Sequence, residues 1–264
     1  VELIELLKAI VLGIVQGITE FLPVSSSGHL LLFERLLGVN TGGADMFLGI
    51  VLHAGTLLSV CAACFPALVR LCREGRRLLL VVLASVPAAL VGFLLRDAVD
   101  EAFFGGELLW LSFALTALLL FACSARLRRG YAPRLLNAPR ALGMGCAQAL
   151  AVIPGLSRSG TTLAAGVFCG LERGAAAEFS LVMSVPVIAG AVLAECLSLA
   201  AGGTGGMPVS WASLAVGTLC AAVFGFFSVK LLLRQTARGS LVPFAVYLLL
   251  LSAALLLFRG AFGA

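Results

Sequence analysis

The sequence predicts an all-α integral membrane protein with six transmembrane helices plus two re-entrant helix-turn-helix hairpins, arranged as an inverted repeat. Three observations support this fold class. Of the 264 residues, 61% are hydrophobic and 12% are charged, and the mean hydropathy is +1.12. The chain therefore has more apolar surface than one soluble core can bury. Several apolar segments are long enough to cross a bilayer, and the two halves of the chain resemble each other.

Six apolar windows are long enough for a bilayer crossing, which takes roughly 20 residues. They cover residues 46–69, 78–95, 108–125, 176–201, 211–233 and 241–258. No lone hydrophobic stretch stands ahead of a soluble domain, so we expect no cleaved signal peptide. We expect one membrane domain over residues 1–264.

Basic residues gather in three of the loops between these windows. The net charge is +5, and the arginines lie mainly at residues 70–77, 126–140 and 234–238. Acidic residues fill the loop at 97–107. Under the positive-inside rule the three basic loops face the cytoplasm and the chain termini lie outside. Because the basic residues mark topology, we expect no nucleic-acid partner.

The two halves, residues 1–132 and 133–264, are predicted to be copies of one repeat. At an offset of 132 positions, polar residues and glycines recur. The matched pairs are Gly13 with Gly145, Gln16 with Gln148, Ser25 with Ser157, Ser27 with Ser159, Gly28 with Gly160, Ala44 with Ala176 and Phe47 with Phe179. Each half holds three windows, an odd number, so the second half enters the membrane in the opposite orientation.

Each half also holds an apolar segment that is broken in the middle. Residues 2–20 are interrupted by the sequence PVSSSGH at 23–29, and residues 141–153 by PGLSRSG at 154–160. Apolar character resumes after each break, but neither piece alone crosses comfortably. Irregular backbone at membrane depth is tolerated only inside protein or along a wet cavity. We therefore predict two re-entrant hairpins whose tips meet inside the protein.

Ionisable residues at membrane depth are candidates for function. Glu20 and His29 flank the first tip, and Arg158 lies at the centre of the second. Further candidates within or near the windows are His53, Glu178 and Glu195. The tips also carry the hydroxyls of Ser25, Ser26, Ser27, Ser157, Ser159, Thr161 and Thr162. A glutamate–arginine pair that only joins the halves is the alternative reading, but packing gives no reason for so many hydroxyls.

The constellation suits a phosphate group. The serines precede the second helix of each hairpin, where free backbone amides and the positive end of the helix dipole favour anions. Arg158 offers a planar fork of donors that matches phosphate oxygens. Glu20 and His29 supply groups able to move protons, which binding alone does not need.

Residues 16–20 (QGITE), 21–29 (FLPVSSSGH) and 154–162 (PGLSRSGTT) resemble the signature segments of the bacterial undecaprenyl-diphosphate phosphatase family, the bacitracin-resistance protein BacA or UppP. The resemblance runs along nearly the whole chain and includes residues 177–180 and 242–247. It implies a multi-pass protein of the bacterial inner membrane that hydrolyses undecaprenyl diphosphate to undecaprenyl phosphate and inorganic phosphate. The active site would face the periplasm, and the reaction would recycle the lipid carrier for peptidoglycan synthesis. The implied partners are the polyprenyl diphosphate lipid, membrane lipid and, in a possible homodimer, a second copy of the chain.

The resemblance also implies roles for single residues. Glu20 and His29 match essential residues, Ser26 matches a proposed nucleophile, and Arg158 matches the diphosphate-binding arginine. The implied substrate-binding set is Gln16, Ser25, Ser27, Ser157, Ser159 and Thr162. The implied cofactor is a divalent cation, Mg or Ca, with Glu20 and Gln16 as its candidate ligands. The family often has Glu at position 16; since an amide cannot act as a base, we assign acid and base roles to Glu20 and His29.

Other lipid phosphatases and membrane proteases do not fit the sequence. Type 2 phosphatidic acid phosphatases need a second histidine after the arginine, and rhomboid proteases need one after the serine. The chain has only His29 and His53, both upstream of Arg158. A transporter or flippase for the lipid carrier stays open, because inverted repeats with broken helices also serve transport. The attacking group also stays open between Ser26, His29 and water.

Overall fold

The computed structural model describes residues 2–39, 44–94, 108–200 and 210–258. Over these residues the chain folds into 11 α-helices, and the only β pairing is an isolated parallel bridge between Arg134 and Leu171. The predicted all-α class is therefore confirmed for the described part of the chain. The acidic loop predicted at 97–107 lies outside the described residues.

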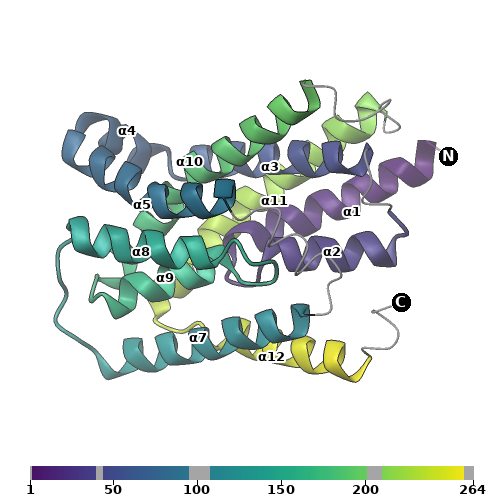
Figure 1. Ribbon diagram of the computed structural model, residues 1–264. Coiled ribbons are helices and arrows are strands. Elements are labelled where there is room, and N and C mark those ends of the chain that lie inside the picture. The colour runs from purple at the N-terminus through teal and green to yellow at the C-terminus, as the bar shows by residue number, and fades with distance from the viewer. Residues whose placement is uncertain (1, 40–43, 95–107, 201–209, 259–264) are drawn as a thin grey trace.

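Two pairs of helices form the predicted hairpins. The first pair is α1 (Glu2–Phe21) and α2 (Ser26–Leu36), and the second is α8 (Ala138–Leu150) and α9 (Arg158–Phe168). Figure 1 shows α1 and α2 entering from the end of the molecule where α1 begins and α12 ends, and α8 and α9 entering from the opposite end. The breaks of the two hairpins lie near the centre of the molecule (Figure 1).

The second helix of each hairpin starts at a serine cap. Ser25 accepts a hydrogen bond from the backbone N–H of Gly28 at 3.4 Å, and Ser157 accepts one from the N–H of Gly160 at 3.1 Å. Capping of this kind satisfies an amide that the first helical turn leaves without a partner. The two caps are offset by 132 residues, as the predicted repeat requires.

The remaining helices include the predicted membrane spans. Among the described residues, the helices long and apolar enough to cross a membrane are α5 (Gly75–Leu94), α7 (Leu109–Arg129), α10 (Arg173–Ala200, over Arg173–Ala194) and α11 (Trp211–Arg238). Each of them overlaps one of the predicted windows. These four helices give the site its scaffold.

The two other windows differ from a simple crossing. The window at 46–69 divides into α3 (Ala44–Ala63) and α4 (Phe65–Arg73), which are bent by 75° at the break. Proline lies in the first turn of α4, and because it lacks an N–H it cannot continue the preceding helix. The last window forms α12 (Val242–Leu257), which has only 16 residues. By length and composition the described residues thus give four spans, or five if the bent pair counts as one.

Glycines let the hairpins pack closely against the scaffold. A Cβ at Gly13 of α1 would lie 2.4 Å from the carbonyl oxygen of Gly217 in α11, and one at Gly145 of α8 would lie 2.4 Å from that of Ala84 in α5. Small residues of this kind allow helix backbones to approach in membranes. Gly13 and Gly145 are a matched pair of the repeat, so each hairpin uses the same position to pack.

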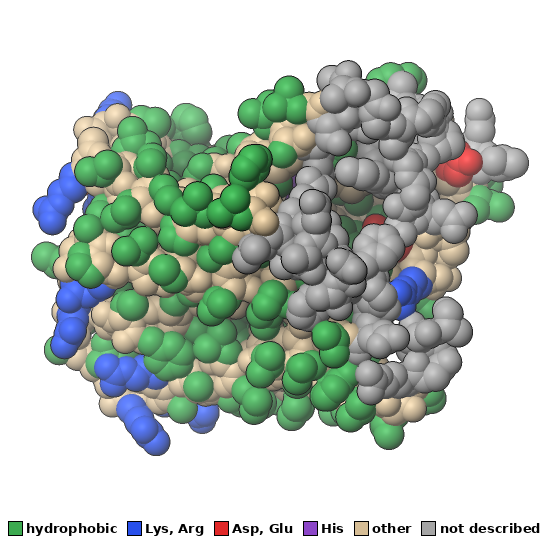
Figure 2. All heavy atoms as spheres, viewed as in Figure 1, with side chains coloured by type: hydrophobic (Ala, Val, Ile, Leu, Met, Phe, Trp, Pro, Cys, Tyr) green, Lys and Arg blue, Asp and Glu red, His purple; other side chains and the backbone are tan. Residues whose placement is uncertain are grey.

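The surface is apolar around the middle and basic at one end. Large side chains such as Leu79, Phe93, Leu118 and Phe227 are exposed, as expected where lipid is the solvent. Figure 2 shows Lys and Arg gathered at the end where α4 and the last turn of α7 lie. The exposed arginines on these and neighbouring elements are Arg70, Arg73, Arg76, Arg77, Arg128, Arg129, Arg134, Arg173, Arg234 and Arg238.

Candidate active site

The two hairpin tips contact each other reciprocally. A Cβ at Gly28 would lie 3.2 Å from the Cα of Gly155, and one at Gly160 would lie 3.2 Å from the Cβ of Pro23. These two contacts are equivalent under the 132-residue offset, because Gly28 matches Gly160 and Pro23 matches Gly155. The tips therefore meet face to face, as the sequence predicts.

Hydrogen bonds also join the tips. The N–H of Gly155 donates to the Ser27 hydroxyl at 3.4 Å, and the Ser159 hydroxyl donates to the Leu22 carbonyl at 2.8 Å. Within the second tip, the hydroxyls of Ser157 and Ser159 lie 3.2 Å apart. Several of the predicted hydroxyls thus hold the two tips in position. The backbone of the tips in turn sets the direction of the side chains at the centre of the contact.

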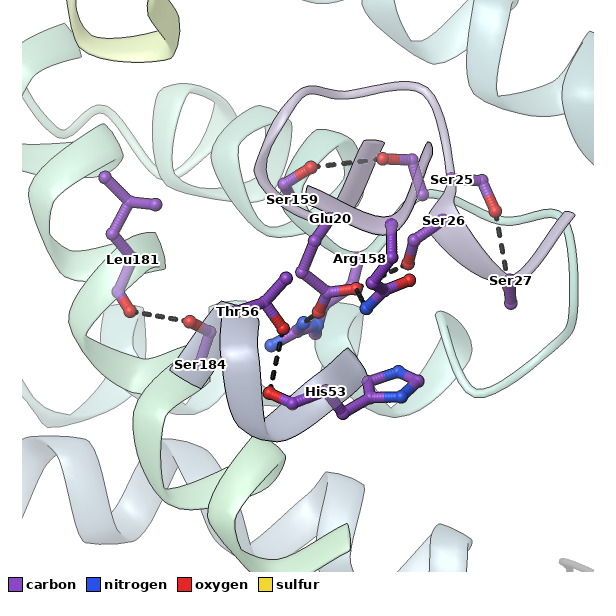
Figure 3. Close-up of polar contacts among 12 residues, drawn as sticks. Glu20, Ser25, Ser26, Ser27, His53, Thr56, Arg158, Ser159, Leu181 and Ser184 are labelled. Carbon is purple, nitrogen blue, oxygen red and sulfur yellow. Dashed lines mark hydrogen bonds and ion pairs between the residues drawn. The ribbon is translucent and has the colours of Figure 1, made fainter. Parts of the chain in front are cut away.

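Glu20 lies at the centre of the meeting point. Its side chain is only 2% exposed and forms an ion pair with Arg158 of the other hairpin. Its second oxygen, Oε2, accepts hydrogen bonds from the Ser26 hydroxyl at 2.6 Å and from the Gln16 amide at 3.0 Å. In Figure 3, Ser26 and Arg158 both point at the Glu20 carboxylate. The structure therefore brings these four predicted residues together.

Some polar atoms of this cluster are buried without a partner. They are Nη1 of Arg158 and Oε1 of Gln16. An unmade hydrogen bond at a buried group costs about 1–3 kcal/mol, so such groups mark places where a polar ligand gains binding energy. The free Nη1 is a donor for an anion, since Nη2 of the same guanidinium already pairs with Glu20.

The N-termini of α2 and α9 add positive electrostatic potential around the cluster. Ser26 is the first residue of α2 and Arg158 the first residue of α9. The amides of a helical first turn and the helix dipole favour a negative group. Thr162, one turn further along α9, bonds instead to Ser180 of α10 at 2.6 Å and so lies behind the cluster.

His29 has both ring nitrogens engaged outside this cluster. Nδ1 lies 2.7 Å from the Ser25 carbonyl oxygen, and Nε2 lies 2.7 Å from the Tyr247 hydroxyl. Of the predicted acid and base candidates, only Glu20 directly contacts the Ser26 hydroxyl. His29 is a neighbour of the cluster through Ser25.

The predicted site did not include Tyr247, which belongs to these surroundings, and His53 was predicted only as a further ionisable candidate. Tyr247 of α12 contacts His29, and His53 of α3 lies close enough to Glu20 to interact with it electrostatically (Figure 3). Gln148, the repeat partner of Gln16, is buried with both amide atoms unpaired. Each is a polar residue in an apolar segment, the same signal that pointed to Glu20.

The other ionisable candidates from the sequence lie elsewhere. Glu178 pairs with Arg70 at 2.9 Å, where both side chains are nearly half exposed. The side chain of Glu195 lies outside the described residues. Glu178 therefore stabilises a surface contact between α10 and α4 and does not contribute to the central cluster.

The two tips share their capping serines and glycines but not their charges. The offset of 132 places Val152 opposite Glu20, Arg158 opposite Ser26, and Thr161 opposite His29. Caps and glycines are common to both tips, whereas the carboxylate comes from one tip and the guanidinium from the other. The contact of the two tips therefore creates a charged site that neither tip has alone.

The predicted metal ligands are one carboxylate and one amide oxygen. Among the described residues, no group of three or more His, Cys, Asp or Glu gathers as a metal centre does. Mg²⁺, however, is often held by one or two carboxylates together with substrate phosphates. The unpartnered Oε1 of Gln16, which lies beside Glu20, fits a cation of that kind.

The buried Glu20 carboxylate binds a partly buried hydroxyl and a partly buried guanidinium between two helix starts, inside an apolar helical scaffold. This arrangement suits a phosphate-bearing ligand in a membrane protein. The chain belongs to the family of the bacitracin resistance protein BacA, whose model matches residues 9–254. This confirms the family resemblance predicted from the two hairpin motifs.

Full-length relatives carry one common name. The chain is 40% identical to the undecaprenyl-diphosphatase of Rubrobacter xylanophilus, over 95% of this chain and 97% of that protein. It is 36% identical to the undecaprenyl-diphosphatase of Halothermothrix orenii, over 98% of this chain and 100% of that protein. For that of Methanosphaera stadtmanae the identity is 33%, over 93% and 95% of the two chains.

Proposed function

We propose that this chain is an undecaprenyl-diphosphatase, which hydrolyses undecaprenyl diphosphate to undecaprenyl phosphate and inorganic phosphate. One observation carries the proposal: the Glu20 carboxylate binds both the Ser26 hydroxyl and the Arg158 guanidinium. The proposed base thus contacts both the proposed nucleophile and the proposed phosphate-binding guanidinium. The shared name of relatives that match nearly the full length supports the substrate. The product is the lipid carrier of peptidoglycan synthesis, which links the reaction to the bacitracin resistance in the family's name.

In the proposed mechanism, Ser26 attacks the terminal phosphorus of the diphosphate while Glu20 accepts its proton. The bond from Oγ to phosphorus forms as the bond from phosphorus to the bridging oxygen breaks, and undecaprenyl phosphate leaves with the electron pair. Water then hydrolyses the phosphoserine and releases inorganic phosphate. A serine hydroxyl needs a neighbouring base to become a good nucleophile, and the 2.6 Å contact with Glu20 Oε2 meets that need.

Arg158 serves as the binding and charge-neutralising group in this scheme. Its Nη1 is free to donate to non-bridging phosphate oxygens while Nη2 keeps Glu20 in place. Phosphoryl transfer depends mainly on positioning and on charge stabilisation of the transition state. The amides at the starts of α2 and α9 add donors on either side of the same point.

A divalent cation, Mg or Ca, is part of the proposal. Glu20 and Gln16 would hold it, and it would neutralise charge on the diphosphate. The carboxylate of Glu20 and the unpartnered amide oxygen of Gln16 support this assignment. Ser26 and Arg158 keep their roles as nucleophile and phosphate clamp.

The proposed membrane arrangement counts the bent pair of α3 and α4 and the short α12 as crossings, together with the four long helices. The two hairpins then enter from opposite sides without crossing, as their opposite directions in Figure 1 support. Residues 1–132 and 133–264 form the inverted copies, and the reciprocal contacts of Gly28 and Gly160 support this division. By the positive-inside rule the arginine-rich end faces the cytoplasm, and the site opens to the periplasm of a bacterial inner membrane.

A transporter for the same lipid is the rival function, since inverted repeats with broken helices also transport. The Ser26 hydroxyl bound to the Glu20 carboxylate favours hydrolysis, because transport needs no nucleophile. The test is phosphate release from undecaprenyl diphosphate by the purified protein in detergent. We expect multiple turnovers for the wild type and almost none for Glu20→Gln. A wild type that binds the lipid but releases no phosphate is not a phosphatase.

A further inference from the structure

The backbone beside the proposed nucleophile is strained. Among the described residues, Ser25 is the only one other than glycine with a positive φ, at 71°. L-residues rarely adopt this region, and such conformations persist only where the surroundings hold them. Because Ser26 follows directly, the geometry of Ser25 decides where the Ser26 hydroxyl points.

His29 holds the strained turn. The Ser25 carbonyl oxygen accepts a hydrogen bond from Nδ1 of His29 at 2.7 Å and a weaker one from the His29 backbone N–H at 3.3 Å. A carbonyl oxygen can only accept, so the proton of the neutral ring is on Nδ1. Nε2 of that tautomer carries the lone pair and must accept.

Tyr247 fills this second position on the ring. Its hydroxyl lies 2.7 Å from Nε2 and therefore donates to it. The two rings stack with centroids 5.7 Å apart and planes 18° apart. Phe113 packs against the same imidazole at 5.4 Å. His29 is thus held from α12, which belongs to the other half of the chain.

We propose that Tyr247 is a positioning residue which, through His29, holds the Ser25 turn so that the Ser26 hydroxyl stays on Glu20. This inference rests on the proposed phosphatase function and refines it. The Tyr247 hydroxyl occupies the only lone pair of the His29 ring. His29 therefore acts on the reaction through Ser25, and neither attacks phosphorus nor takes the Ser26 proton.

The chain contains a matched control for this hydroxyl. It has only two tyrosines. The other one, Tyr131, lies in the segment that joins α7 to α8, and its hydroxyl donates to the Leu171 carbonyl at 2.6 Å. Each tyrosine thus makes one hydrogen bond through its hydroxyl. Tyr247→Phe and Tyr131→Phe each remove one tyrosine hydroxyl. The first lies in the proposed chain of hydrogen bonds from Tyr247 through His29 to Ser25, and the second lies outside it.

Nuclear magnetic resonance of ¹⁵N-labelled histidine tests the hydrogen bonds of His29 with Tyr247 and Ser25 directly, because the chain has only two histidines. A His53→Gln background leaves His29 as the single signal. We expect a neutral ring with the proton on Nδ1, and an Nε2 resonance that moves in Tyr247→Phe but not in Tyr131→Phe. A proton on Nε2, or an unchanged resonance in Tyr247→Phe, overturns the inference. This measurement needs no substrate, so it stands even if the purified protein releases no phosphate.

Phosphate release tests the consequence for Ser26. We expect Tyr247→Phe to lower kcat roughly 10-fold with KM little changed, as loss of one positioning hydrogen bond allows, and Tyr131→Phe to match the wild type. His29→Asn keeps an N–H near the position of Nδ1, but its side chain is too short to reach the Tyr247 hydroxyl, and the amide cannot act as a base. It should retain measurable turnover, and adding Tyr247→Phe to it should cost nothing more. An unchanged kcat in Tyr247→Phe, or a His29→Asn variant as inactive as Ser26→Ala, contradicts the assignment.

Discussion

Arg158 and Glu20 form an ion pair across the contact of the two hairpin tips, 138 residues apart in the sequence. Their side chains are 19% and 2% exposed, whereas those of the surface pair Arg70 and Glu178 are 49% and 43% exposed. Because both side chains are shielded from solvent, removing either charge should destabilise the protein, since it leaves the other charge buried without a partner. The same guanidinium keeps one nitrogen free, so the pair both joins the halves and leaves a donor for a ligand.

Arg158→Lys should therefore lower phosphate release by roughly 10²-fold or more, as removal of a transition-state charge stabiliser does. Lysine keeps the charge beside Glu20, so we expect the protein to fold and insert. It loses the planar fork that can bind Glu20 and phosphate at once. Arg70→Lys, at the exposed pair, should behave as wild type. Near-normal turnover of Arg158→Lys would remove this residue from the site.

The packing of the second tip against α7 should be sensitive to a single methyl group. Gly155 has a φ of +86°, and a Cβ there would lie 2.7 Å from that of Ser112. We expect Gly155→Ala to lower the free energy of unfolding by about 1–3 kcal/mol, seen as a lower Tm in detergent. Gly190→Ala is the control, because no atom beyond the backbone of its own helix lies within 4 Å of its Cβ position. Equal Tm values for the two variants would argue against close packing of the second tip on α7.

Much of this arrangement could be predicted from the sequence, because local chemistry determines it. The residues PVSSSGH and PGLSRSG break two apolar segments, and the helices do restart at serine caps there. Repetition at one offset predicted that the tips meet, since equivalent parts of two copies contact each other around a symmetry axis. The bend at Cys64 was not predicted, although Pro66 in the following turn is a known helix breaker.

The assignment of a divalent cation predicts that activity depends on the cation concentration and on the residue at position 16. Chelation should lower activity, and added Mg or Ca should restore it. Gln16→Glu places a second carboxylate beside Glu20, which raises the negative charge offered to a cation. We therefore expect half-maximal activity at a lower cation concentration in this variant, measured by phosphate release across a titration. Activity that ignores both chelator and added cation would remove the metal from the account.

The proposed topology predicts which segments share one side of the membrane. Residues 70–77, 126–140 and 234–240 should react with a membrane-impermeant thiol reagent from one side, and both termini from the other. The measurement uses single cysteines placed in a cysteine-free variant, since the native chain has eight cysteines. If the loops at Arg73 and Arg128 label from opposite sides, the count of crossings is wrong.

The supporting residues of the site were harder to predict than its centre. Glu20, Ser26 and Arg158 lie in recognisable motifs, but Tyr247 reaches His29 from a helix 218 residues further along the chain. Only packing brings such residues together, and no local pattern encodes that pairing. His29 itself was predicted as an acid or base. Its two occupied nitrogens became visible only once α12 was in place.

The central claim is that Ser26, activated by Glu20, attacks the phosphorus, and trapping the covalent species tests it most directly. The purified protein is mixed with undecaprenyl diphosphate, quenched in acid within one turnover, and digested for mass spectrometry. We expect acid-stable phosphate on Ser26 in the wild type and much less of it in Glu20→Gln. Ser252→Ala is the control and should keep the phosphate on Ser26, because the Ser252 hydroxyl donates to the Trp110 carbonyl and not to Glu20. Full turnover by Ser26→Ala, or rapid phosphate release by the wild type with no phosphoserine at any quench time, would contradict the account and leave water or His29 as the attacking group.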